Sequence, residues 1–316
     1  MKPESAGRLD HGGHGGESRA RRSLISVSSE TRRALRGHAL LVAIGLVAAT
    51  VAIRAQASRI ISIVPATTEM LFAIGAGDRV IAVGTYDRFP PEVDRLPRLG
   101  ALLDPNVERI IAMRPDLVVL YGTQDTLRAQ LERASIPYYA YTHRGLSDVA
   151  DTMRSLGRRV GVAARANEAA QRLEQQIASV RAKVAGRAKP KALLVFGREP
   201  RSLRGIDASG GVGFLHDMLE AAGAVNALAD VTRQAVQMST EMVLARAPDV
   251  IIELRYTGGD ETSQADVKAW DALPAVPAVR NKRVFLLQGE EFVVPGPRVG
   301  HAVERLSRTI HPDAWR

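Results

Sequence analysis

The fold of this chain is decided by the stretch Arg59-Ile-Ile-Ser-Ile-Val-Pro-Ala-Thr-Thr-Glu-Met-Leu-Phe-Ala-Ile-Gly-Ala-Gly-Asp78. Its β-branched run over 60–64 predicts a strand that ends at Pro65, and the apolar residues after it share one face of a predicted helix over 67–76. The residues 80–83 then predict a second strand. Strand, turn, helix and strand in this order favour a parallel α/β layer, in which ligands meet the carboxyl ends of the strands.

Length and charge narrow the class of protein. The chain has 316 residues, enough for two domains, and a formal net charge of +9. The chain has 43 Lys/Arg and 34 Asp/Glu, of which residues 1–57 hold nine and four. The rest of the chain therefore has 34 Lys/Arg and 30 Asp/Glu. The body is therefore only weakly basic, and no basic run alternates with aromatic residues there. We expect no nucleic-acid partner.

The chain contains no cysteine. This excludes disulfides, thiolate metal sites, cysteine nucleophiles and the acylation site of a lipoprotein in one step.

The amino-terminal part carries the pattern of an export signal. Three arginines between 32 and 36 precede an uncharged apolar run over 39–53, and Ala55-Gln-Ala57 supplies a small-x-small site. We expect a disordered basic extension over 1–38, a signal peptide with its cleavage site over 39–57, cleavage after Ala57 and export to the periplasm. Two alternatives stay open: the apolar run could remain as an uncleaved anchor, and residues 1–31 could precede the true start codon.

From residue 58 onward the pattern repeats in two halves. Strands are predicted at 60–64, 80–83, 117–120 and 137–141, and again at 191–196, 250–254 and 283–287, with helices between them. A run of strong helix formers over 163–185 separates the halves and ends before Gly186. The sequence predicts an α/β fold with an amino-terminal lobe (58–160), a bridging helix (161–187) and a carboxyl-terminal lobe (188–316). Both lobes are expected to be Rossmann-like, with mostly parallel sheets joined by the single long helix.

Several short motifs support a family resemblance. They include Pro65-Ala-Thr-Thr-Glu69, Tyr86-Asp-Arg-Phe-Pro-Pro-Glu92, Gly100-Ala-Leu-Leu-Asp-Pro-Asn-Val-Glu108, Met218-Leu-Glu-Ala-Ala-Gly223 and Gly296-Pro-Arg298. In this order and spacing they resemble the periplasmic substrate-binding proteins of ABC importers for cobalamin, haem and ferric siderophores, in which two lobes are joined by one long helix. The cobalamin-binding branch is the most similar.

The resemblance implies a function and a partner. A protein of this kind is no enzyme: it captures cobalamin between its lobes and delivers it to an ABC permease in the inner membrane. It implies that one exposed glutamate on each lobe docks onto the permease, and the matching residues are Glu69 and Glu220. We expect a monomer with no catalytic residue, no metal site and no resident cofactor.

Loops at the carboxyl ends of the predicted strands supply the candidate ligand-binding residues. Aromatic faces there would suit a large planar ligand. The candidates are Tyr86, Tyr121, Tyr141, Arg198, Tyr256 and Phe292. Two alternatives for the ligand remain: His143 or a tyrosine could ligate haem iron, and Arg198, Arg255 and Arg298 would suit an anionic ferric siderophore.

The sequence also bears on two other classes of protein, hydrolases and sensor-linked binding modules. A hydrolase is disfavoured because the chain has no Gly-x-Ser-x-Gly elbow, no His-Glu-x-x-His pair and no clustered carboxylate dyad. A binding module that serves a sensor instead of a permease is not excluded by the sequence.

Overall fold

The computed structural model describes residues 57–256 and 264–316. The predicted extension and nearly all of the predicted signal peptide therefore lie outside the described residues. Within the described ranges, no helix has both the length and the apolar character needed to cross a membrane.

The first half of the chain builds a four-stranded sheet in the order β2-β1-β3-β4, with every neighbouring pair parallel. Its strands are β1 (Ile60–Ser62), β2 (Val80–Val83), β3 (Leu117–Tyr121) and β4 (Tyr138–Tyr141). The helices of this half are α2 (Pro65–Ala73), α3 (Val107–Ala112), α4 (Asp125–Arg133) and α5 (Ser147–Arg159), with 3₁₀ turns η1 (Gly77–Arg79) and η2 (Pro91–Arg95).

The second half builds a six-stranded sheet in the order β10-β9-β5-β6-β8, with β7 pairing with β5. Its strands are β5 (Lys191–Gly197), β6 (Ile206–Ser209), β7 (Val225–Asn226), β8 (Ala235–Met238), β9 (Val250–Arg255) and β10 (Val284–Gln288). Its helices are α7 (Phe214–Ala221), α8 (Thr240–Arg246), α9 (Gln264–Val267), α10 (Pro277–Arg280) and α11 (Val299–Ile310), with 3₁₀ turns η3 (Lys268–Ala272), η4 (Glu290–Phe292) and η5 (Pro312–Ala314).

The predicted fold class is confirmed: two α/β lobes with mostly parallel sheets flank one long helix. The sequence analysis predicted neither the helix α5 nor the strands β6 and β8, which run antiparallel to their neighbours. These strands have four residues each and contain polar side chains. So short a segment carries little periodicity, and its pairing depends on partners elsewhere in the chain.

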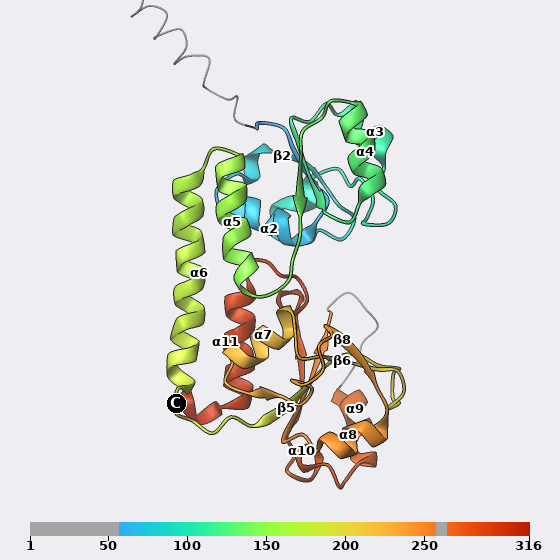
Figure 1. Ribbon diagram of the computed structural model, residues 1–316, viewed down its shortest axis with the longest axis vertical. Helices are drawn as coiled ribbons and strands as arrows, with labels where there is room; N and C mark the ends of the chain where they lie inside the picture. The colour runs from blue at the N-terminus through green and yellow to red at the C-terminus, as the bar shows by residue number, and fades with distance from the viewer. Residues whose placement is uncertain (1–56, 257–263) are drawn as a thin grey trace, which may run out of the picture. The chain divides into compact units, whose positions relative to one another are not determined.

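The long helix α6 (Ala163–Val184) contacts elements of both halves (Figure 1). Its 22 residues make a rod about 33 Å long. The buried positions recur every three or four residues and form one apolar stripe: Ala166, Ala169, Ala170, Leu173, Ile177, Val180 and Val184. The stripe packs against α5 in the first half and against α11 in the second.

One apolar core extends through both halves. It joins β1 and α2 to α5 and α6, and it continues through α7 and α11 to the strands β5 and β9. Two smaller cores lie on the other faces of the sheets, one in each half. The lobes therefore share a continuous apolar seam in addition to the helix that connects them.

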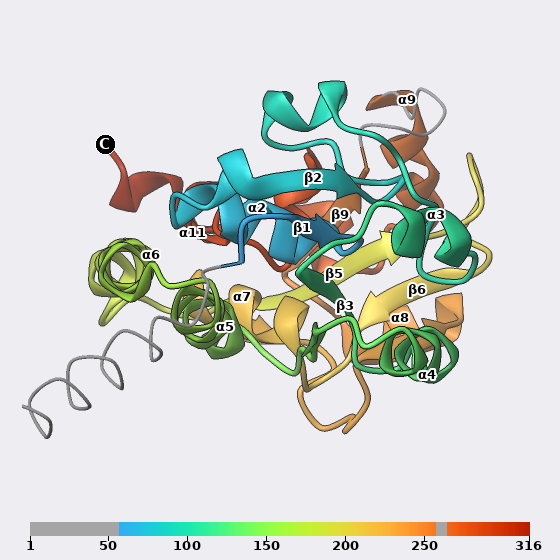
Figure 2. The same cartoon turned by 90° about the horizontal axis from the view of Figure 1, so that it is seen from above.

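Within this seam, α5 and α6 lie side by side in close contact (Figure 2). A Cβ atom added at Gly157 of α5 would lie 2.1 Å from the Cβ of Ala166 in α6. Both atoms belong to helix backbones that cannot move independently. Glycine is thus required at this position because no larger residue fits against α6.

We expect Gly157→Ala to lower the free energy of unfolding by about 1–3 kcal/mol, although alanine is the better helix former, because the added methyl overpacks the contact. Denaturant unfolding of the purified protein measures the change. Ala166→Gly should recover part of the loss in the double variant. A stabilised Gly157→Ala variant would show that the two helices are not held in this contact.

Candidate functional site

A cavity of about 450 Å³ opens where the two halves meet. The first half contributes the carboxyl ends of β1, β2 and β3, together with the loop 101–104. The second half contributes the segment 293–295, between η4 and α11. The cavity therefore occupies the place where open parallel sheets bind ligands.

The rim of this cavity exposes large apolar side chains. Tyr86 is 62% exposed and Leu103 is 93% exposed, and Leu102 and Val293 are also exposed. Single exposed apolar residues are ordinary, but a group of them around one cavity marks a surface that binds an apolar or aromatic partner.

The structure places two of the six predicted ligand residues, Tyr86 and Tyr121, in the wall of the cavity. A third, Tyr256, lies outside the wall, and its hydroxyl accepts a hydrogen bond from Arg88 Nε at 2.8 Å. This bond joins the loop after β2 to the end of β9 and so spans the two halves.

Tyr141 was predicted to bind ligand, but it does not line the cavity. It is buried behind Tyr121, with the two ring centroids 5.9 Å apart, and it stacks on His143 at 6.2 Å. The His143 ring in turn meets the edge of Phe214 at 5.2 Å, and both of its nitrogens are buried without a hydrogen-bond partner. Burial lowers the pKa of His143, which favours the neutral imidazole. His143 is not among the residues that line the cavity.

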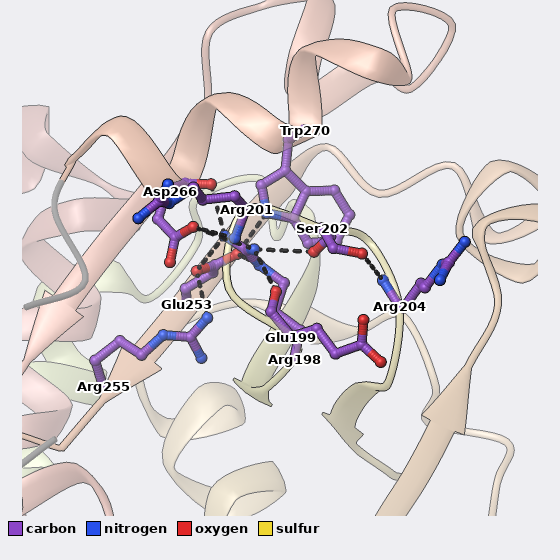
Figure 3. A network of polar contacts seen from close by, with 9 residues as sticks. All are labelled: Arg198, Glu199, Arg201, Ser202, Arg204, Glu253, Arg255, Asp266 and Trp270. Carbon is purple, nitrogen blue, oxygen red and sulfur yellow. Dashed lines mark hydrogen bonds and ion pairs between the residues drawn. The ribbon is translucent and has the colours of Figure 1, made fainter. Parts of the chain in front are cut away.

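The prediction that Arg198 binds ligand is wrong, because its side chain is fully buried in the second half (Figure 3). Its guanidinium donates to both carboxylate oxygens of Glu253, at 2.5 and 3.2 Å, and to three main-chain carbonyls. Trp270 Nε1 and Arg255 also donate to Glu253. A carboxylate within the buried strand β9 needs such partners, since an unpaired buried charge is strongly unfavourable.

Phe292 was also predicted to bind ligand, but the structure places it away from the cavity wall. It is fully buried in the core beneath α11, with the guanidinium of Arg305 4.7 Å from its ring centroid. The segment 293–295, directly after it, is what reaches the cavity.

A buried ion pair connects the two walls of the cavity. Arg298 donates to Glu69 at 3.0 and 2.6 Å, and Glu69 is only 4% exposed. Arg298 also lies 3.5 Å from Glu290 and 4.2 Å above the ring of Phe89. Burial raises the pKa of Glu69, and the guanidinium of Arg298 opposes this effect. Gly296 permits the approach, because a Cβ there would lie 2.7 Å from a carboxylate oxygen of Glu69.

This ion pair corrects the expectation that Glu69 is an exposed docking residue. Its carboxylate is held inside the protein and is not available to a partner in this conformation. Glu220 is different, since it is exposed near the end of α7, beside a second hollow between α5, α6 and α7.

Two parts of the cavity wall were not predicted from the sequence: the loop 101–104 and the segment 293–295. Asp87 belongs to the loop after the second predicted strand, which was expected to line the cleft, and it does line the cavity. The loop 101–104 belongs to a motif that carries the family resemblance, but nothing in its composition indicated a cavity. The segment 293–295 reaches the cavity only through tertiary packing.

Comparison with known proteins identifies the class. The model of a family described as periplasmic binding protein matches residues 60–291, which is more than half of the chain. The chain belongs to the periplasmic binding protein family. Members of this family are substrate-binding proteins of transporters, and the family is not one of enzymes.

Individual relatives bind related ligands. This periplasmic binding protein is 32% identical to the vitamin B12-binding protein of Salmonella choleraesuis over 256 residues, which cover 80% of this chain and 90% of the relative. Among solved structures, it resembles the vitamin B12 binding protein BtuF of Vibrio cholerae, with a TM-score of 0.70, 26% identity and coverage of 83% and 99%. It also resembles the haem-binding protein RhuT of Roseiflexus sp. RS-1, with a TM-score of 0.68, 25% identity and coverage of 82% and 99%.

We expect Arg298→Met to lower the free energy of unfolding by about 3 kcal/mol, because it leaves Glu69 buried without its cation and beside Glu290. Denaturant unfolding measures the loss. Adding Glu69→Gln should restore part of the stability, since the unpaired charge is then removed. Equal losses in the single and double variants would show that the ion pair is not coupled as described.

Proposed function

We propose that this periplasmic binding protein captures cobalamin, or a closely related corrinoid, in the cavity between its halves and delivers it to an ABC permease. The observation that carries the proposal is the cavity itself: it lies at the ends of three parallel strands, and its rim exposes Tyr86 and apolar side chains. Aromatic and aliphatic surfaces of this kind suit the face of a large planar ring. The vitamin B12-binding relatives support the same ligand.

Haem is the second candidate, and it is supported by the haem-binding structural neighbour. The position of His143 favours it less, because the imidazole is packed between Tyr141 and Phe214 outside the cavity wall. The anionic ferric siderophore loses most of its support, since Arg198, Arg255 and Arg298 are all engaged with glutamates.

We expect calorimetric and visible-absorbance titration of the purified protein to give one-to-one binding of cobalamin. Tyr86→Ala should weaken this binding about tenfold, because it removes an aromatic face from the rim. Met242→Ala, which truncates an exposed apolar side chain of α8 away from the cavity, is the matched control and should have no effect. Tight binding of hemin or of a ferric siderophore alone would overturn the choice of a corrinoid.

We also propose that Glu220 contributes to docking on the permease. It is an exposed acid three residues before Gly223, where the helix dipole gives it no local benefit. Glu220→Ala should weaken association with permease-containing membranes about tenfold and leave ligand affinity unchanged. Glu241→Ala, at another exposed acid of the same half, is the control. Unchanged association of the Glu220 variant would remove this residue from the interface.

Delivery to a permease requires export, and we propose that the signal over 39–57 provides it. Amino-terminal sequencing of the exported protein should begin at Ser58. A mature chain that retains residues 39–53 would instead support an uncleaved anchor.

A further inference from the structure

The charged residues in the wall of the cavity are all acids. Asp87 lies on the loop after β2 and Asp104 on the loop 101–104, and within the described ranges no arginine, lysine or histidine lines the cavity. The other lining residues are apolar or uncharged. A ligand in this cavity therefore meets carboxylates without a compensating cation.

The arginines nearest to the cavity are already bound within the protein. Arg298 is paired with Glu69. Arg98 donates to the main-chain carbonyls of Gly84, at 3.2 Å, and of Asp87, and to the carboxylate of Asp94 at 3.2 Å. Arg88 donates to the hydroxyl of Tyr256 at 2.8 Å and lies 3.8 Å from Glu290. None of the three can turn to a ligand anion without giving up these partners.

Of the two acids in the cavity wall, Asp87 and Asp104, Asp87 has the more unusual environment. It is 1% exposed, and its carboxylate packs against Gly84 and lies beside the hydroxyl of Thr68, both of which favour the ionised form. The hydroxyl of Thr68, which lies beside it, donates to Ser62 Oγ at 2.8 Å. Burial still outweighs these contacts, so the acid is costly to keep in the cavity wall, and this cost points to a role in recognition.

The groups that face Asp87 determine its charge. Glu69 of α2 disfavours ionisation, the guanidinium of Arg98 favours it, and the ring of Tyr121 lies on β3. Burial, the largest effect, raises the pKa of Asp87 to about 7. The side chain is thus mostly protonated at acidic pH and mostly ionised above neutrality. In the ionised state it repels a ligand carboxylate, and in the neutral state it offers that carboxylate no cation.

We propose that this cavity selects corrinoids whose peripheral side chains are amides and rejects ligands that bring a free carboxylate into it, with Asp87 as the residue that determines this discrimination. The inference rests on the proposed function, because it assumes that the cavity holds a corrinoid. Amide groups are uncharged, so neither the buried Asp87 nor the exposed Asp104 repels them. A ligand carboxylate would lose its hydration water and would be repelled by the acids in the wall. The cavity would thus discriminate against acidic ligands through an unfavourable contact.

The test uses two corrinoids with the same ring and different side chains. Dicyanocobinamide carries amides, and dicyanocobyrinic acid carries carboxylates in their place. Each is titrated into the purified protein by visible absorbance at pH 8 and at pH 6. We expect the amide ligand to bind at least 100-fold more tightly at pH 8, with a smaller ratio at pH 6.

Asp87→Asn removes the charge at nearly constant shape and should reduce the ratio at pH 8 at least tenfold, mainly by improving the affinity for the acid. Asp104→Asn should reduce it less, because Asp104 is exposed at the rim. Asp78→Asn makes the same change at an exposed residue of η1 outside the cavity wall and should leave the ratio unchanged.

Three outcomes would overturn the inference. If the unmodified protein binds both corrinoids equally, or if the ratio persists in both the Asp87 and Asp104 variants, these acids do not determine the choice. If neither corrinoid binds while hemin does, the proposed function fails and the inference fails with it. The two failures are therefore distinguishable in one series of titrations.

Discussion

The ion pair between Glu69 and Arg298 is the interaction on which the cavity depends. The two residues are 229 positions apart in the chain, and each lies a few residues beyond a segment that lines the cavity: Pro65 and Ala66 on one side, and 293–295 on the other. The pair therefore fixes the distance between the two walls. A bidentate arginine–carboxylate contact restricts orientation as well as distance, so the walls are held in register.

The two halves use the ends of their strands differently. In the second half, Arg198, Glu253, Arg255 and Trp270 satisfy one another inside the lobe, and little of their hydrogen-bonding capacity faces outward. In the first half, the ends of β1, β2 and β3 open directly onto the cavity. Most of the ligand-facing chemistry thus comes from one lobe, and the other closes the cavity with a short apolar segment. Candidates were taken from the strand ends of both lobes. This division explains why the candidates that line the cavity, Tyr86 and Tyr121, come from the first lobe.

Local patterns in the sequence were sufficient to predict most of the secondary structure and the long helix, because buried strands and an apolar helical stripe have distinct periods. Tyr86 and Tyr121 both line the cavity because the carboxyl ends of parallel strands meet at one edge of the sheet. Arg198 was misplaced because its partner is 55 residues away. A signal did exist, since a glutamate inside the buried run Val250-Ile-Ile-Glu-Leu254 requires a cation nearby. Glu69 offered no such signal, because a helix's first turns accept an acid readily.

The apolar seam shared by the two halves has a consequence for folding. Because β1 and α2 belong to the same core as α11 and β9, neither sheet can lose its packing without exposing residues of the other. The described residues also form one compact unit. Excising either lobe would therefore expose core side chains of the lobe that remains.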